Sequence, residues 1–270
     1  MPIDTPIGRQ GWRQGSVMRK DNHPNLDDHV RACLLENARV VIASHDCDVT
    51  NESYEKEPKV DLIIIHPAER RQGRRAFGKN PRELELALQL AGKEVTHVAH
   101  GCNRPQNCRK LLENITPDPD AILLPQTVDQ LRSWLAQRSN RSVFPDEFVK
   151  RISKIQSRID SILDESGAEL SVILMALTPA GEAGPKETYE VYLYAVMPND
   201  LFTHIALRSK AQSVVDNLEK LLHDCDGVRV IDAFLKSEGE VTLDDLHHLK
   251  RFTSDYLSHK NASSAFHPQK

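Results

Sequence analysis

The sequence predicts an α+β fold, in which a β-rich, small barrel-like N-terminal domain precedes a C-terminal domain with the element order α-β-β-α-β-α. Short apolar runs separated by turn residues dominate residues 11–94, whereas helical periodicity dominates residues 127–167. The chain of 270 residues is also longer than one compact core requires. We therefore predict two domains, residues 1–125 and residues 126–270.

The first half is expected to contain four strands and one short helix. The strands are the apolar runs 15–18, 38–44, 60–66 and 84–90, and the helix spans residues 26–37. In the last strand, leucines at positions 84, 86, 88 and 90 alternate with other residues, which is the strand period. A helix starting at Asn80 and Pro81 is the alternative. The strand is favoured because a helix would spread these leucines around its circumference.

The second half is expected to begin with two helices. Thr127 and Gln130 form a capping box for a helix that ends near Arg138, and a longer helix runs from Pro145 to Gly167. Strands at 170–177 and 189–196 are joined by a loop rich in Pro, Gly and Ala. A helix at 204–222, a strand at 228–235 and a final helix from Thr242 to about Ser258 follow.

Composition excludes several classes of protein. No segment approaches the roughly 18 consecutive apolar residues of a membrane span, and residues 1–16 lack the apolar run of a signal peptide. The five cysteines are an odd number scattered over a long chain, which indicates reduced thiols and a cytoplasmic protein. The net charge of −4 gives no global attraction to nucleic acid, so such binding requires a local basic patch.

An acidic segment follows the apolar run 40–43. If the chain stays extended, Asp46 and Asp48 project from one face about 7 Å apart, which one cation can span. Glu57, just before the next strand, is expected to oppose them. The three carboxylates are therefore candidate ligands of Mg²⁺ or Mn²⁺. The alternative is that the aspartates form turns at a strand end, with His45 solvated and Cys47 a small core residue.

A basic segment follows the strand 60–66. It contains six cations and no acid: Arg70, Arg71, Arg74, Arg75, Lys79 and Arg82. Guanidinium groups pair bidentately with phosphate, so these residues are candidate ligands of a nucleic-acid backbone, and Phe77 is a candidate to stack on a base. The alternative is a solvated loop whose cations pair with nearby acids.

A group of candidate zinc ligands follows, namely His97, His100, Cys102 and Cys108. Their spacing departs from that of common zinc knuckles, and His97 and His100 on one strand would face opposite sides. A strand followed by a polar loop with incidental thiols is therefore the favoured interpretation.

Three resemblances bear on function. Asp48, Glu57 and Lys59 resemble the metal-dependent nuclease core of many restriction enzymes, which implies that the acids hold divalent ions and the lysine positions a water. Residues 11–18 and 40–44 resemble the opening strands of the small barrel in PemK and MazF type toxins, which cut RNA without metal. The Ser-x-Asp-Cys-Asp element, residues 44–48, resembles an uncharacterised group of bacterial proteins, which implies a bacterial source.

The most specific hypothesis is a metal-dependent phosphodiesterase, a nuclease of a bacterial antiviral defence or toxin system. Asp46, Asp48 and Glu57 would bind the metal, and Lys59 or His45 would serve the attacking water. The basic segment would hold the substrate. The alternative is a non-catalytic adaptor of such a system, which binds nucleic acid or docks a protein partner on the helix 145–165. A zinc-dependent hydrolase is a third hypothesis.

Overall fold

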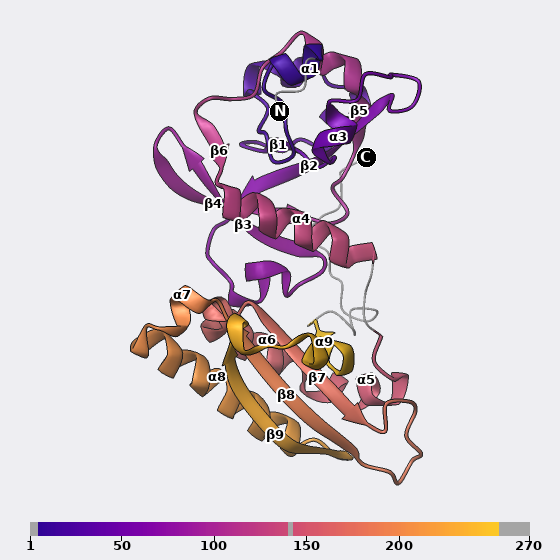
Figure 1. The fold of residues 1–270 in the computed structure, drawn as a ribbon, viewed down its shortest axis with the longest axis vertical. Helices are drawn as coiled ribbons and strands as arrows, with labels where there is room; N and C mark the ends of the chain where they lie inside the picture. The colour runs from indigo at the N-terminus through magenta and orange to yellow at the C-terminus, as the bar shows by residue number, and fades with distance from the viewer. Residues whose placement is uncertain (1–4, 140–142, 254–270) are drawn as a thin grey trace. The chain divides into compact units, whose positions relative to one another are not determined.

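The computed structural model describes residues 5–139 and 143–253, and its fold is α+β with a β-rich first part. The chain divides into two compact units. The first unit contains the chain up to Arg70 together with Arg82–Leu135, and the second contains Arg71–Pro81 together with the described residues from Ala136 onward. Figure 1 shows the elements of both units along the chain. Within the described residues, no helix combines the length and apolar character that a membrane span requires.

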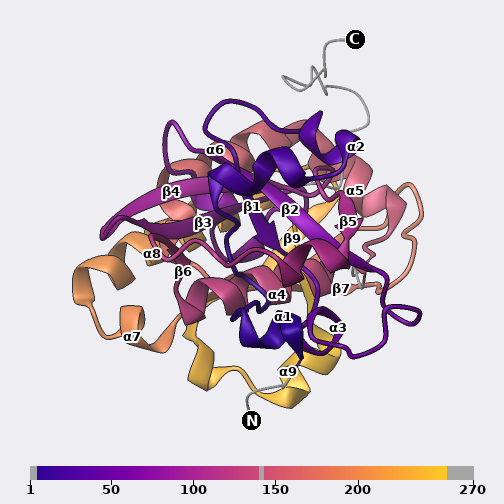
Figure 2. The ribbon, with the colours of Figure 1, turned by 90° about the horizontal axis from the view of Figure 1, so that it is seen from above.

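The first unit is built on an antiparallel sheet with the strand order β1-β2-β4-β3-β6, and β5 pairs with β2 (Figure 2). Its strands are β1 (Arg39–Ile42), β2 (Lys59–Pro67), β3 (Glu83–Leu90), β4 (Lys93–His100), β5 (Gln106–Cys108) and β6 (Ala121–Leu123). The helices of this unit are α1 (Pro6–Arg9), α2 (Asp28–Arg31), α3 (Asp46–Val49) and α4 (Pro125–Ser139). The sequence prediction of strand rather than helix at 84–90 is confirmed.

Both faces of this sheet are covered. Leu131 and Trp134 of α4 pack against one face, beside Ile63 and Leu86. On the other face, Trp12 is fully buried, and its indole N–H donates to the carbonyl oxygens of Leu112 and Ile115. The strands are therefore buried on both sides, which explains why β2 has a nearly continuous apolar run.

The second unit is a four-stranded sheet with the order β10-β7-β8-β9, covered on one face by helices. Its elements are α5 (Asp146–Ile152), α6 (Gln156–Ser166), β7 (Val172–Thr178), β8 (Tyr189–Met197), α7 (Asn199–Phe202), α8 (Ile205–His223), β9 (Val228–Ser237), α9 (Leu243–His248) and β10 (Lys250–Phe252). Strands β7 and β8 form an antiparallel hairpin, while β8 and β9 are parallel and α8 lies in the connection between them. Leu193 and Ala195 of β8 pack with Val214 and Leu218 of α8.

Short 3₁₀ helices join several of these elements. They span Lys20–Asn25, Gly73–Gly78, Arg109–Glu113, Ser153–Ile155, Gly167–Glu169 and Glu238–Glu240.

Four expected elements differ in the structure. The helix expected at 26–37 is α-helical only at Asp28–Arg31, and residues 15–18 make isolated bridges rather than a strand. The helix expected from Pro145 to Gly167 is interrupted at Ser153–Ile155, where the hydroxyl of Ser153 donates to the carbonyl oxygen of Lys150. The last helix was expected to reach Ser258, but it ends at His248. Lys250–Phe252 pairs with β7 instead, because this buries Phe252 beside Phe144. Residues 254–258 of that helix lie outside the described residues.

Gly73 is required where the segment Arg71–Pro81 packs on the end of α6. A Cβ atom at Gly73 would lie 2.0 Å from the carbonyl oxygen of Leu163 and 2.7 Å from the backbone nitrogen of Ala168. Because backbone atoms cannot move aside cheaply, we expect Gly73→Ala to lower the free energy of unfolding by about 1–3 kcal/mol. Urea denaturation measures this loss. The control is Gly181→Ala, whose Cβ would meet no atom within 4 Å, and equal midpoints for the two variants would contradict the prediction.

Candidate functional site

The acidic segment forms the short helix α3 rather than an extended strand end. His45 is its N-cap residue, and Nδ1 of His45 accepts a hydrogen bond from the backbone N–H of Cys47. The carboxylate of Asp46 accepts from the backbone N–H of Gln14 at 2.7 Å. The extended geometry that would place Asp46 and Asp48 on one face is therefore wrong, because local capping favours a helical turn.

The thiol of Cys47 lies between two polar side chains. Its Sγ is 3.1 Å from Nδ1 of His45, and it donates to Oδ1 of Asp48 at 3.3 Å. This hydrogen bond to Asp48 raises the pKa of Cys47, since a neighbouring carboxylate disfavours the thiolate. Cys47 is exposed rather than a core residue, and its protonated thiol is a weak nucleophile at neutral pH.

The loop after α3 is held by one buried side chain, Arg109, which is fully excluded from solvent. Its guanidinium lies 4.5 Å from the ring centroid of Tyr54. It donates to five backbone carbonyl oxygens at the end of α3 and in this loop, those of Asp48, Val49, Asn51, Ser53 and Glu57. Arg109 thus fixes the path of residues 48–57 through their backbone. No local sequence signal indicated this role, because its partners lie far away in the sequence.

The predicted metal ligands do not gather into a ligand group. In residues 5–139 and 143–253, no three His, Cys, Asp or Glu side chains are arranged so that they could hold a metal ion together. Glu57 contributes its backbone oxygen to Arg109, and Lys59 is an exposed residue that pairs with Cys108 across β2 and β5. Binding of Mg²⁺ or Mn²⁺ by Asp46, Asp48 and Glu57 stays a prediction.

The predicted zinc ligands are also spread apart. His97 and His100 lie on opposite faces of β4, as the strand period requires. Nδ1 of His100 is 3.5 Å from the carboxylate of Glu83, while Cys102 and Cys108 are exposed free thiols. The four candidate zinc ligands are close in the sequence, but their side chains do not converge on one position that a metal ion could occupy.

His97 is buried and uncharged. Its side chain is almost fully removed from solvent, and burial, with a smaller effect of Arg39, lowers its pKa to about 4. The unfolded chain, with an ordinary histidine pKa of 6.5, binds the proton more strongly. The stabilising effect of neutral His97 is therefore complete above pH 6.5 and is lost as the pH falls towards 4.

We expect this linkage to cost on the order of 2 kcal/mol of unfolding free energy between about pH 7 and about pH 4.5. Urea denaturation of wild type and His97→Leu at both values measures it. Burial also lowers the pKa of His66, so the variant should retain part of the dependence. The same pH dependence in both proteins would contradict the assignment to His97.

The predicted basic segment is largely part of the second unit. Arg74 forms ion pairs with Asp164 at 3.0 Å and Asp160 at 3.8 Å, both on α6. Lys79 is buried, and its ammonium donates to the carbonyl oxygen of Leu170. Arg74 therefore pairs with nearby acids, which was the alternative to phosphate binding for this segment. Among the other predicted phosphate ligands, Arg70, Arg71 and Arg82 are exposed, and Arg75 is half-buried.

The helical segment 145–165, expected to dock a partner, turns its apolar residues inward. Phe148, Ile152 and Ile159 are all buried in the core of the second unit. These side chains are used within the chain itself.

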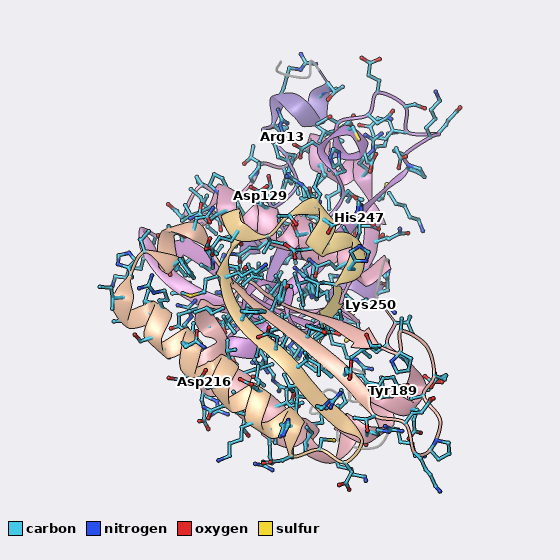
Figure 3. All side chains as sticks on the ribbon, turned by 60° about the horizontal axis from the view of Figure 1, so that its bottom comes forward. Arg13, Asp129, Tyr189, Asp216, His247 and Lys250 are labelled. Carbon is cyan, nitrogen blue, oxygen red and sulfur yellow. The ribbon has the colours of Figure 1, made fainter. Side chains whose placement is uncertain are left out.

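A row of side chains that the sequence analysis did not identify crosses the outer face of the second sheet, which is the face opposite α8. The strand registers place Arg251 opposite Leu174, Leu174 opposite Tyr194, and Tyr194 opposite Phe234. We call these four residues the outer row. In Figure 3, β9, the edge strand of this sheet, runs from near Tyr189 at the lower end towards α9.

The aromatic members of the outer row are accessible. Phe234 is 40% exposed, and its ring centroid is 5.5 Å from that of Tyr194 in an edge-to-face arrangement. Nζ of Lys236 lies 4.1 Å from the centroid of Tyr194 and 3.6 Å from a carboxylate oxygen of Asp245. Tyr192, two residues before Tyr194, faces the same side, where Asp232 is its neighbour. The outer face therefore combines aromatic rings with cations and two acids.

A sequence signal for the outer row exists in part. Tyr192 and Tyr194 alternate with Val191, Leu193 and Ala195, so one face of this strand is aromatic while the other is aliphatic. Phe234 and Arg251 come from distant segments, and only the strand registers show that they join the row.

The comparisons with known proteins add no relative. No family model, no curated protein and no solved structure matches the chain.

Proposed function

We propose that this protein binds single-stranded nucleic acid through the outer row, without acting on it chemically. The observation that carries the proposal is the alignment of Arg251, Leu174, Tyr194 and Phe234 across one sheet face, on which Phe234 is exposed and Leu174 is buried. Proteins that bind single strands use aromatic side chains on such a face as platforms for unpaired bases. Phe234 presents the most accessible ring for the first base.

The charges around the outer row support a single strand as the ligand. Lys236 is a cation beside the ring of Tyr194, where a phosphate backbone would pass, while Arg251 is half-buried opposite Leu174 at the other end of the row. Asp232 and Asp245 lie nearby and reduce the net positive charge. Affinity should therefore depend more on stacking than on counterion release, and salt should weaken binding only moderately.

This proposal corresponds to the non-catalytic alternative of the sequence analysis. It is favoured over the nuclease hypothesis because the candidate acids are engaged in local structure. Asp46 accepts from the backbone of Gln14, and Asp48 accepts from Cys47. The experiment described next tests the nuclease hypothesis as well.

The experiment is fluorescence anisotropy of labelled oligonucleotides, with single-stranded RNA, single-stranded DNA and the matching duplexes. Single strands should bind more tightly than duplexes, because the bases of a duplex are stacked on each other and hidden from the outer row. Equal affinity for duplex and single strand, or no binding, would contradict the proposal. Gel analysis of the same samples with Mg²⁺ or Mn²⁺ tests the rival hypothesis, since cleavage lost in Asp48→Asn would support a nuclease.

A further inference from the structure

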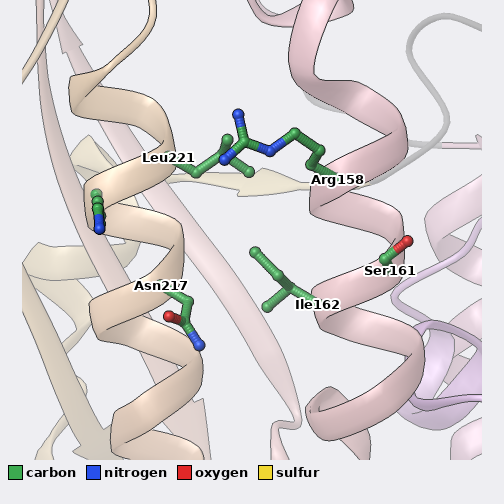
Figure 4. A pocket seen from close by; sticks show the side chains of 6 residues that line it. Arg158, Ser161, Ile162, Asn217 and Leu221 are labelled. Carbon is green, nitrogen blue, oxygen red and sulfur yellow. The ribbon is translucent and has the colours of Figure 1, made fainter.

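A groove of about 420 Å³ lies between α6 and α8 in the second unit (Figure 4). Each helix contributes to it one cation, one neutral polar residue and one apolar residue. The lining residues are Arg158, Ser161 and Ile162 from α6, and Asn217, Lys220 and Leu221 from α8. The groove lies on the helical layer, so it is separate from the outer row on the opposite sheet face.

Some of these side chains point into the groove and others point away from it. Figure 4 shows the guanidinium of Arg158 extending from α6 towards Leu221, and Ile162 and Asn217 pointing into the space between the helices. The hydroxyl of Ser161 points away from α8 and donates to the carbonyl oxygen of Ser157. Ile162 and Leu221 thus form an apolar floor, while Arg158 and Asn217 supply hydrogen-bond donors.

The two cations are not neutralised by their surroundings. Arg158 and Lys220 are exposed, and neither forms an ion pair with another described residue. The residues four positions from Arg158 are Ile162 on α6 and Lys154 in the 3₁₀ turn just before it, so neither is an acid. Lys220 has Asp216 and Asp224 one turn away, which makes Arg158 the stronger anion ligand.

We propose that this groove binds a small organic anion, a phosphate, sulfonate or carboxylate attached to an apolar or planar body. The anionic group would be held by the fork of Arg158, with Lys220 and the amide of Asn217 beside it. The body would cover Ile162 and Leu221 and remove them from water. The volume of about 420 Å³ fits a small molecule rather than a docked helix.

The experiment measures binding of 8-anilinonaphthalene-1-sulfonate, an aromatic sulfonate, by isothermal titration calorimetry on the full chain. Arg158→Gln should weaken this binding at least tenfold, because the fork that holds the sulfonate is removed. Lys154→Gln is the matched control. It removes an exposed cation in the 3₁₀ turn directly before α6, which does not line the groove, and the variant should bind the probe as wild type does.

Two further measurements separate this site from others. Any 8-anilinonaphthalene-1-sulfonate that binds at the outer row should be lost in Phe234→Ala but retained in Arg158→Gln. The groove can therefore be tested even if the outer row does not bind nucleic acid. Arg158→Glu should abolish binding at the groove while the circular dichroism spectrum stays unchanged. Binding that is equal in wild type, Arg158→Gln and Arg158→Glu would overturn the proposal.

Discussion

Replacing Arg109 by methionine should lower the free energy of unfolding by about 3–5 kcal/mol. Arg109 is fully buried and donates to five backbone carbonyl oxygens between Asp48 and Glu57. Methionine fills a similar volume but donates nothing, so these carbonyl groups lose a donor in a place that water reaches poorly. Arg109→Lys should recover little, because one ammonium cannot reproduce the planar fork that reaches all five oxygens.

Urea denaturation measures this effect, and Arg229→Met is the matched control. Arg229 is an exposed residue whose ion pair with Glu190 lies at the surface, where such pairs contribute about 0–1 kcal/mol. A large loss at Arg109 beside a small one at Arg229 is expected. Similar midpoints for the two variants would show that Arg109 does not hold the loop.

Replacing Phe234 by alanine should weaken binding of a single strand by about 5-fold to 150-fold. Stacking of a base on an aromatic side chain contributes about 1–3 kcal/mol, which corresponds to this range of Kd. Phe234 is 40% exposed, so its truncation should leave the fold intact. Anisotropy with labelled single-stranded RNA gives the two dissociation constants.

The control for this prediction is Phe234→Tyr, which keeps the ring and should bind nearly as tightly as wild type. Ile231→Ala is a second control, because Ile231 is equally exposed, on the same strand, but is not aromatic. Loss of binding in Ile231→Ala equal to that in Phe234→Ala would indicate a general apolar surface rather than stacking.

Strong periodic patterns predicted the strands and helices well. The leucines at 84–90 alternate along β3, and the helix expected from Thr127 is present as α4, although it begins at Pro125, so Thr127 lies in its first turn and is not its N-cap. In both cases the signal is local, since each residue's role follows from its neighbours in the sequence. The α+β fold class rests on these patterns and is confirmed.

A strand carrying His97 and His100 was expected, but the bounds of β4 were not predicted, because its turn and its sequence are unusual. The tight turn before it uses Ala91 and Gly92, both with positive φ, although Ala rarely adopts this conformation. The strand itself mixes Lys93, Glu94 and Thr96 with few apolar residues. Pairing with β3 and β2 on its two sides overrides these weak preferences.

The candidate sites depended on non-local structure that a sequence pattern does not contain. Arg74 was assigned to a phosphate site, but its partners Asp160 and Asp164 lie far away in the sequence and meet it only in the folded unit. The outer row likewise joins residues of four strands. The sequence therefore showed where the basic residues cluster, but not which acidic residues form ion pairs with them in the folded protein.

Photo-crosslinking is the most direct test of the outer row. The protein is irradiated with single-stranded RNA that contains 4-thiouridine, and trypsin then releases residues 230–236, which include Phe234, as one peptide. The account predicts crosslinks on this peptide and on the one that contains Tyr194. Crosslinks confined to the basic segment between Arg70 and Arg82, or to the acidic segment near Asp48, would contradict it.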